Sequence, residues 1–234
     1  MIQPDPGTLR EAEKQAAARA AVQLVQSGSV VGLGSGSTAS LAIRFLAERV
    51  RSGLKMVGIP TSLATKTLAE QLGIPLTTLD ESPAIDIDID GADEIDPHLN
   101  LIKGGGGAML REKVIASASK RFVVVAESVK LVPQLGRFPL PVEVISFAEA
   151  LVKRRIEALG AKVTLRKHQD QSVYVTDEGH HILDCNFSEI ADPAALNAKL
   201  HEIPGVVEHG LFIGMAEIAF VGKGNDAQVV QVRR

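Results

Sequence analysis

Hydrophobic positions in the first part of the chain follow two periods in turn. Longer stretches repeat apolar residues at helical spacing, and short apolar runs of strand length lie between them. The expected helices cover 8–27, 38–50, 64–72 and 109–118, and the expected strands cover 29–33, 54–59, 85–90 and 121–126. Short buried strands that alternate with helices are typical of an α/β fold with a mostly parallel sheet.

The pattern changes around 136–141, where two prolines interrupt it. Beyond this point, strands are expected at 142–145, 162–166, 172–176 and 181–185, and helices at 148–159 and 193–202. This order predicts a small α+β domain with an antiparallel sheet. The apolar run 210–221 is expected to return to the first domain as a strand, with a frayed or peripheral tail after it. We therefore expect one domain from 1–135 plus about 210–234, and a second domain at 136–209.

The composition excludes several classes of partner. Of the 234 residues, 45% are hydrophobic, the net charge is −3, and no run of Lys and Arg stands out. Nucleic acid and membrane surfaces are therefore not expected to bind, whereas a local cluster of donors can still hold a small anion. Cys185 is the single cysteine, so neither an intramolecular disulfide nor a Cys-rich zinc site is expected. Because no long apolar segment occurs, we expect a cytoplasmic protein.

The first candidate site is a glycine loop between an expected strand and an expected helix, with the sequence Gly-Ser-Gly-Ser-Thr-Ala at 34–39. Glycines allow a sharp turn and close approach to a ligand, and the helix that follows directs free N–H groups at an anion. Hydroxyl groups add further donors, so a phosphate is the expected ligand. The candidate ligand contacts are Ser35, Gly36, Ser37 and Thr38. A plain strand-to-helix turn explains the same pattern.

The loop also matches a weak dinucleotide-binding pattern. That function requires an acidic residue about twenty positions further on to hold the ribose. The end of the next expected strand supplies Pro60, Thr61 and Ser62 instead. Nucleotide binding is therefore a minor alternative.

The second candidate is an acidic strand that begins at Asp86. The segment does not complete a calcium loop, because Pro97 occupies the position that needs a bidentate Glu. The alternation of Ile and Asp places Asp86, Asp88 and Asp90 on one face of a strand. We expect function for Asp90 and Asp93, at the end of the strand where α/β sheets bind ligands. We expect Asp86 and Asp88 to lie at a solvated edge of the strand.

The third candidate is Lys103 followed by four consecutive glycines, with Glu112 shortly after them. Such a run is entropically costly and fits close approach of the backbone to a ligand. Glu112 falls early in the next helix, where it is a candidate catalytic group. Acidic residues are also common in first turns because they interact favourably with the helix dipole, which is the alternative explanation. The histidines are scattered without the spacing of a metal site, so no metal is expected.

In combination, these segments resemble ribose-5-phosphate isomerase, type A. The resemblance runs from about Lys14 to Gly222. The segments that carry it are Gly-Ser-Gly-Ser-Thr-Ala at 34–39, Asp-Gly-Ala-Asp-Glu at 90–94, Lys-Gly-Gly-Gly at 103–106, Arg-Glu-Lys at 111–113, and the stretch 136–145. It implies a Rossmann-like domain, a smaller ferredoxin-like domain and a homo-oligomer, usually a dimer.

The resemblance also implies an activity and a set of site residues. The activity is the interconversion of ribose 5-phosphate and ribulose 5-phosphate in the non-oxidative pentose phosphate pathway, without a cofactor. Glu112 takes the place of the general base, and a carboxylate that shuttles one proton between neighbouring carbons needs no metal. Asp90, Asp93 and Lys103 are the other candidate catalytic residues. The implied substrate contacts are Lys14, Ser35, Gly36, Ser37, Thr38, Gly91, Ala92, Gly104, Gly105, Gly106 and Lys130.

Two other classes of protein compete with this interpretation. A sugar-phosphate-sensing regulator would keep the first glycine loop without needing Glu112, but the chain has only one helix before its first strand, too little for a helix-turn-helix domain. An amino-sugar-phosphate deaminase-isomerase or a coenzyme A transferase would use a similar scaffold.

Overall fold

The computed structural model describes residues 6–224 and 228–233, the last range by its backbone alone. The chain divides into two compact units. The first contains 1–92, 111–131 and 215–234, and the second contains 93–110 and 132–214. The boundaries predicted from the sequence lie near 136 and 210, whereas in the structure 93–110, 132–135 and 210–214 belong to the second unit.

The first unit is built on a six-stranded sheet with the order β13-β12-β6-β3-β1-β2. All neighbouring strands pair in parallel except β12 and β13, which are antiparallel. The strands are β1 (Ser29–Leu33), β2 (Met56–Pro60), β3 (Ile87–Asp90), β6 (Phe122–Glu127), β12 (Ile218–Lys223) and β13 (Gln228–Arg233). This arrangement confirms the predicted Rossmann-like α/β fold.

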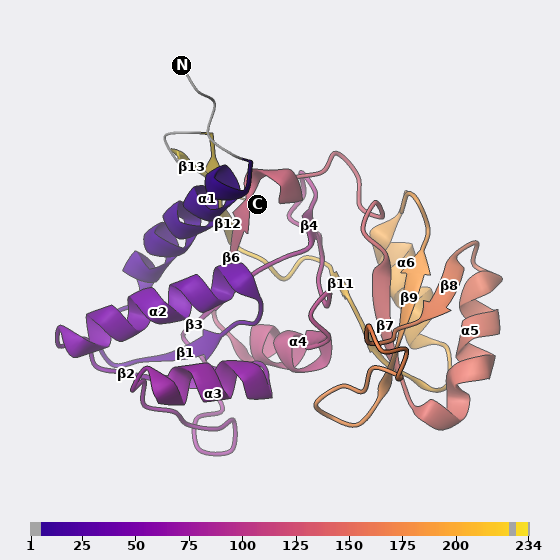
Figure 1. The fold of residues 1–234 in the computed structure, drawn as a ribbon, viewed down its shortest axis with the longest axis horizontal. Coiled ribbons are helices and arrows are strands. Elements are labelled where there is room, and N and C mark those ends of the chain that lie inside the picture. Colours follow the sequence, from indigo (N-terminus) through magenta and orange to yellow (C-terminus); the bar gives the residue numbers. More distant parts are fainter. Residues whose placement is uncertain (1–5, 225–227, 234) are drawn as a thin grey trace. The chain divides into compact units, whose positions relative to one another are not determined.

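Helices cover both faces of this sheet. They are α1 (Pro6–Ala21), α2 (Ser37–Arg51), α3 (Leu63–Gln71) and α4 (Met109–Ala118), with short 3₁₀ turns η1 (Val22–Leu24) and η2 (Ser128–Lys130). The helices α1 and α2 lie side by side, and both contact β6 (Figure 1). Val31 packs in the core under these helices, whereas Val30 packs in the cluster that contains Ile115 of α4. Because adjacent strand residues point to opposite faces, α4 covers the other side of the sheet.

The second unit alternates strands and helices in the ferredoxin-like order β7, α5, β8, β9, α6 and β10. Its antiparallel sheet has the order β10-β7-β9-β8. The elements are β7 (Leu140–Val144), η3 (Ser146–Ala148), α5 (Glu149–Glu157), β8 (Lys162–Leu165), β9 (His181–Asn186), α6 (Pro193–His201) and β10 (Val206–His209). A small three-stranded sheet in the order β11-β5-β4 completes the unit. Its strands are β4 (Glu94–Ile95), β5 (Leu101–Ile102) and β11 (Leu211–Phe212).

Three expectations about the elements need correction. No strand forms at 172–176, where only isolated bridges occur, because the chain turns tightly at Gln171 with a φ of 69°. The expected strand at 210–221 is split into β11 and β12, and Gly214 adopts a positive φ between them. Moreover, the tail is not frayed throughout, since β13 pairs with β12; it is peripheral, because β13 is the edge strand of the sheet.

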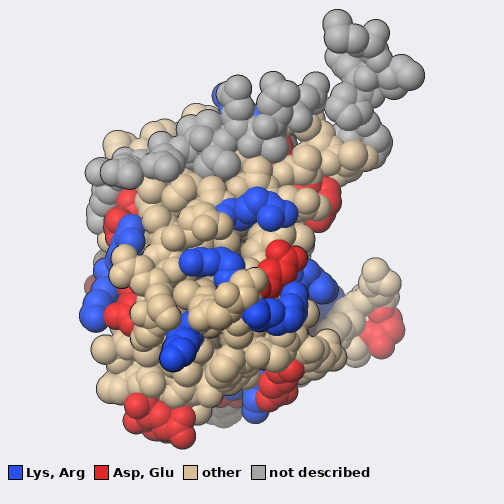
Figure 2. Space-filling model, turned by 90° about the vertical axis from the view of Figure 1, so that its left-hand side faces the viewer, with Lys and Arg blue, Asp and Glu red and all other residues tan. Residues whose placement is uncertain are grey.

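The surface carries charges of both signs. Figure 2 shows Lys and Arg side chains interspersed with Asp and Glu on the face that it views. Among the described residues, no helix combines the length and hydropathy required to cross a bilayer.

Close packing of α1 on β12 gives a first prediction. A Cβ atom on Gly222 would lie 2.0 Å from the carbonyl oxygen of Glu13 and 2.5 Å from its Cα. Gly222→Ala should therefore lower the free energy of unfolding by about 1–3 kcal/mol, the usual cost of overpacking. Chemical denaturation measures this change. Gly106→Ala is the control, because a Cβ there meets nothing within 4 Å. Equal stability of the two variants would contradict the packing argument.

Candidate active site

The glycine loop after β1 packs directly on the end of β3. The Gly34 amide donates to the carbonyl oxygen of Ile89 at 3.0 Å. The Ser35 amide donates to Oδ1 of Asp90 at 2.9 Å, and the same oxygen accepts from the Gly91 amide at 2.7 Å. A Cβ on Gly34 would lie 2.2 Å from that Asp90 oxygen. Glycine is therefore required at 34, and the fully buried Asp90 carboxylate holds the loop in place.

A chain of hydroxyl groups supports this loop from the neighbouring strand and helix. Ser35 Oγ donates to Ser62 Oγ at 2.9 Å, and Ser62 Oγ donates to Thr65 Oγ1 at 3.0 Å. Thr65 Oγ1 then donates to the carbonyl oxygen of Gly34 at 2.9 Å. Because a hydroxyl has a single proton, the Ser35 side chain donates within the protein. Thr65 has no sequence signal that predicts this role, unlike Thr61 and Ser62, which closely follow an expected strand.

The first turn of α2 has the features of an anion site. Gly36 precedes the helix with a φ of 91°, a conformation that favours glycine. The N-terminus of the helix carries unpaired N–H groups and a partial positive charge. Lys14 Nζ donates to Ser37 Oγ at 3.0 Å, which places a cation at this end of the helix. Thr38 Oγ1 makes a long contact of 3.5 Å with Glu127 Oε2.

Glu13 links α1 to the segment that carries Lys130. Its carboxylate accepts from the Ser128 amide at 3.0 Å and from the Gly224 amide at 2.8 Å. Lys130 lies at the end of the η2 turn that begins with Ser128. Glu13 is nearly fully buried, so these backbone donors compensate the loss of hydration of its charge.

The acidic strand is central in the sheet, and its carboxylates differ sharply in solvent exposure. Asp86 is partly exposed and accepts from Lys120 Nζ at 2.8 Å and from the Val30 amide at 2.9 Å. These hydrogen bonds, led by that from Lys120, hold the pKa of Asp86 below its usual value. Asp88 is fully buried, so the expected solvated edge is wrong for this residue. The reason is that β3 lies between β1 and β6.

Glu112 lies in the first turn of α4, and only 4% of its surface is exposed. The sequence placed it early in a helix but did not show whether it was buried. A carboxylate at an exposed first turn would serve the helix dipole alone. Burial of an ionisable group is costly and is common at functional sites.

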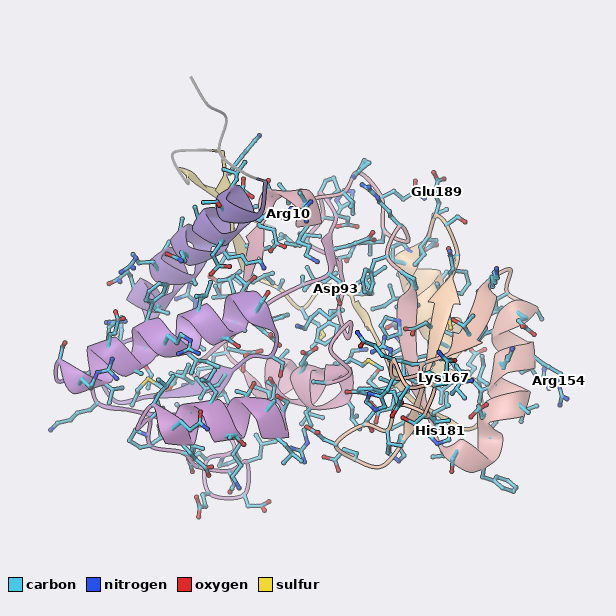
Figure 3. The ribbon with its side chains drawn as sticks, in the orientation of Figure 1. Arg10, Asp93, Arg154, Lys167, His181 and Glu189 are labelled. Atoms are coloured by element: carbon cyan, nitrogen blue, oxygen red, sulfur yellow. The ribbon has the colours of Figure 1, made fainter. Side chains whose placement is uncertain are left out.

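The second glycine loop belongs to the second unit. Asp93, labelled in Figure 3, precedes β4, and its Oδ2 accepts from the Gly105 amide at 2.7 Å. Lys103 follows β5, and its amide donates to the carbonyl oxygen of Gly210 at 2.9 Å. Its side chain is buried, with Nζ 5.5 Å from the centre of the Phe212 ring. Asp93 and Lys103 are therefore positioned by the same small sheet.

Comparison with known proteins identifies the family. Residues 57–226 match the family model described as ribose 5-phosphate isomerase A (phosphoriboisomerase A). Ribose-5-phosphate isomerase A of Nitrobacter hamburgensis is 51% identical over 232 residues, which cover 97% of this chain and 100% of the relative. The solved ribose 5-phosphate isomerase A of Methanocaldococcus jannaschii has a TM-score of 0.91 and 42% identity, covering 96% of this chain and 99% of that one. A D-ribose-5-phosphate isomerase solved in complex with phospho-erythronic acid has a TM-score of 0.93 and 38% identity, with the same coverage.

The chain belongs to the ribose-5-phosphate isomerase A family. The predicted activity is thereby confirmed: the protein is an aldose–ketose isomerase of ribose 5-phosphate. A sensing module, a deaminase-isomerase and a coenzyme A transferase no longer compete.

The hydroxyl chain beneath the first loop gives a second prediction. Thr65→Val in this isomerase removes the donor to Gly34 and one partner of Ser62. We expect KM for ribose 5-phosphate to rise about five- to thirtyfold, because the net contribution of roughly one or two hydrogen bonds is lost. The value of kcat should change little. Steady-state kinetics measure both constants. Thr67→Val on the same helix is the control, since its exposed hydroxyl donates to the carbonyl oxygen of Leu63 within α3. A normal KM in the Thr65 variant would show that the chain does not support the loop.

Proposed function

We propose that the protein interconverts D-ribose 5-phosphate and D-ribulose 5-phosphate through an enediolate, with Glu112 as the general base. The observation that carries this proposal is a buried carboxylate in the first turn of α4, six residues after the Gly106 loop position. Removing a proton from one carbon and returning it to the next requires a single base. Buried ionisable side chains are common at functional sites, and this supports the assignment of the role to Glu112.

The developing oxyanion requires fixed donors. We assign this role to Lys103 and to backbone amides of the loop formed by Gly104, Gly105 and Gly106. Lys103 is buried and held through its backbone, which supports a fixed position for its ammonium group. Because the Gly105 amide already donates to Asp93, Gly106 is the better amide donor for the substrate.

Asp90 and Asp93 are proposed to bind sugar hydroxyls and to assist opening of the furanose ring. They lie three positions apart, with Gly91 and Ala92 between them as predicted substrate contacts. Both carboxylates already accept from backbone amides of a glycine loop. Each carboxylate would therefore contact a glycine loop and a sugar hydroxyl at the same time.

The phosphate is proposed to bind at the N-terminus of α2. The amides of the first helical turn, the hydroxyls of Ser37 and Thr38, and the cation of Lys14 support this assignment. Gly36 shapes the turn, and Ser35 acts beneath it through internal hydrogen bonds that include those to Asp90 and Ser62. Lys130 is the second proposed cation. Binding energy from the phosphate then orients the reacting carbons.

A homodimer and a cytoplasmic location are also proposed. The dimer rests on the family resemblance, and the location rests on the composition. Light scattering of the purified protein would test the oligomeric state directly.

The general-base role gives a third prediction. Glu112→Gln should lower kcat by about 10²- to 10⁴-fold, the usual contribution of one general base. Binding of phospho-erythronic acid, measured by calorimetry, and the thermal unfolding temperature should change little. Glu70→Gln, at an exposed position of α3, is the matched control and should keep full turnover. Normal turnover of the Glu112 variant would remove this residue from the mechanism.

Chelators provide a fourth prediction. Among the described residues, the side chains able to hold a metal ion together are His201, Glu208 and His209. The sequence spacing did not indicate this group, and it contains none of the proposed site residues. Activity should therefore be unchanged after dialysis against EDTA, as measured by the initial rate. Loss of activity that a divalent ion restores would indicate a metal-assisted mechanism.

A further inference from the structure

We infer that Arg166 and Tyr174 are positioning residues of the isomerase, which set the orientation of the Gly106 amide by holding the carbonyl oxygens of the second glycine loop. The inference rests on the proposed function, in which this loop donates hydrogen bonds to the developing oxyanion. Neither residue belongs to a sequence motif.

Arg166 binds the loop from the end of β8. Its Nη1 donates to the carbonyl oxygen of Gly104 at 2.9 Å and to that of Gly105 at 3.2 Å. Its other donors bind Asp184 on β9 in a bidentate pair, with Nε 3.0 Å from Oδ2 and Nη2 bonded to Oδ1. This pair is largely shielded, with 13% and 24% of the two side chains exposed. Asp184 therefore fixes the guanidinium plane, and the guanidinium fixes two consecutive peptides.

These contacts determine where the loop amides point. In a trans peptide the carbonyl oxygen and the next amide point in opposite directions. Arg166 holds the Gly104 oxygen, and the following amide, that of Gly105, donates to Asp93. By the same geometry, the hold on the Gly105 oxygen directs the Gly106 amide away from Arg166. Within the described part of the chain this amide donates to no protein group, and Gly106 itself is exposed. It is therefore a free donor with a fixed direction.

Tyr174 holds the next peptide. Its hydroxyl donates to the carbonyl oxygen of Gly106 at 3.1 Å. The ring lies so close to the loop that a Cβ on Gly107 would be 2.3 Å from the hydroxyl and 2.6 Å from Cζ. Gly107 also has a φ of 84°, which favours glycine. Burial raises the pKa of Tyr174. The charge of Arg166 opposes this shift, and the Asp177 and Glu143 carboxylates add to it, so the phenol stays protonated and can donate at neutral pH.

Tyr174 is itself tied to Arg166 and to the sheet. Its amide donates to the Arg166 carbonyl oxygen at 3.0 Å. Two residues further on, Thr176 Oγ1 donates to Oε1 of Glu143 at 2.8 Å, and His180 Nδ1 lies 2.9 Å from the same oxygen. Glu143 is buried on β7. The segment that carries Tyr174 is thus anchored at both ends.

The test measures turnover and binding separately. In Arg166→Met, kcat should fall about 10- to 100-fold, somewhat less than for removal of a whole oxyanion donor, and KM should stay within about threefold. In Tyr174→Phe, which keeps the ring, kcat should fall about three- to tenfold, the effect of one neutral hydrogen bond. Arg154→Met is the matched control, because Arg154 extends outward from α5 (Figure 3). It should show normal constants.

Ligand binding distinguishes positioning from a general loss of structure. Phospho-erythronic acid carries a planar carboxylate that resembles the enediolate, whereas inorganic phosphate carries only the phosphate group. The inhibition constant of phospho-erythronic acid should rise with the loss of kcat in both variants, and that of inorganic phosphate should stay constant. Equal loss for both inhibitors, or a loss confined to KM, would overturn the inference.

Chemical rescue provides a second readout. In Arg166→Ala, millimolar guanidinium should restore part of kcat, and the same concentration of sodium should not. If the Arg166 variants fail to fold, Tyr174→Phe decides alone, and normal kcat in it overturns the inference. Glu112→Gln is assayed in parallel. Full turnover in that variant refutes the proposed function, whereas its loss combined with normal Arg166→Met and Tyr174→Phe refutes only the positioning role.

Discussion

The contact between the Asp90 carboxylate and the backbone at Gly34 is the constraint on which the first glycine loop depends. Parallel pairing brings the ends of β1 and β3 together, in the register Leu33 to Ile89. The next residue of each strand must then fit into the same space, where a Cβ on Gly34 cannot be accommodated. The amides of Ser35 and Gly91 bind the carboxylate that fills this space. One acidic residue thus shapes the loop that leads to α2 and also faces the end of the sheet where ligands bind.

Two other buried carboxylates also accept hydrogen bonds from backbone amides. Glu94 accepts from the amides of Gly136 and Phe138, at 2.8 and 2.6 Å, and thereby ties the small sheet to the start of the ferredoxin-like unit. Glu13 does the same for Ser128 and Gly224. Backbone amides offer rigid donors without adding charge, so they compensate a buried carboxylate at low entropic cost. These two acidic residues connect chain segments, so acidity alone does not identify a catalytic group.

The sequence predicted those features that depend on periodicity or on local chemistry. Apolar spacing located the strands and helices of the first unit, and the Ile and Asp alternation placed Asp86, Asp88 and Asp90 on one face. The sequence could not show that this strand is central, because strand order depends on long-range pairing. For this reason the prediction of a solvated position for Asp88 is wrong. The same limit hid Thr65 and Arg166, whose partners lie 31 and 62 residues away. Two-residue strands such as β4 are too short to have a period.

The two glycine loops are held by different chemistry, and this difference supports the separate roles that we propose for them. The Asp90 carboxylate binds an amide of the first loop, and neutral hydroxyls support the loop from below. This loop offers fixed amides at a helix N-terminus, which is sufficient for a phosphate that stays charged throughout the reaction. A guanidinium and a phenol hold carbonyl oxygens of the second loop. A cation bonded to a carbonyl oxygen polarises the peptide, and the N–H of that peptide becomes a stronger donor. Stronger donation is most useful where negative charge appears only in the transition state, because catalysis depends on interactions that strengthen there. The proposed enediolate oxygen gains its negative charge in the transition state, whereas the phosphate is charged throughout.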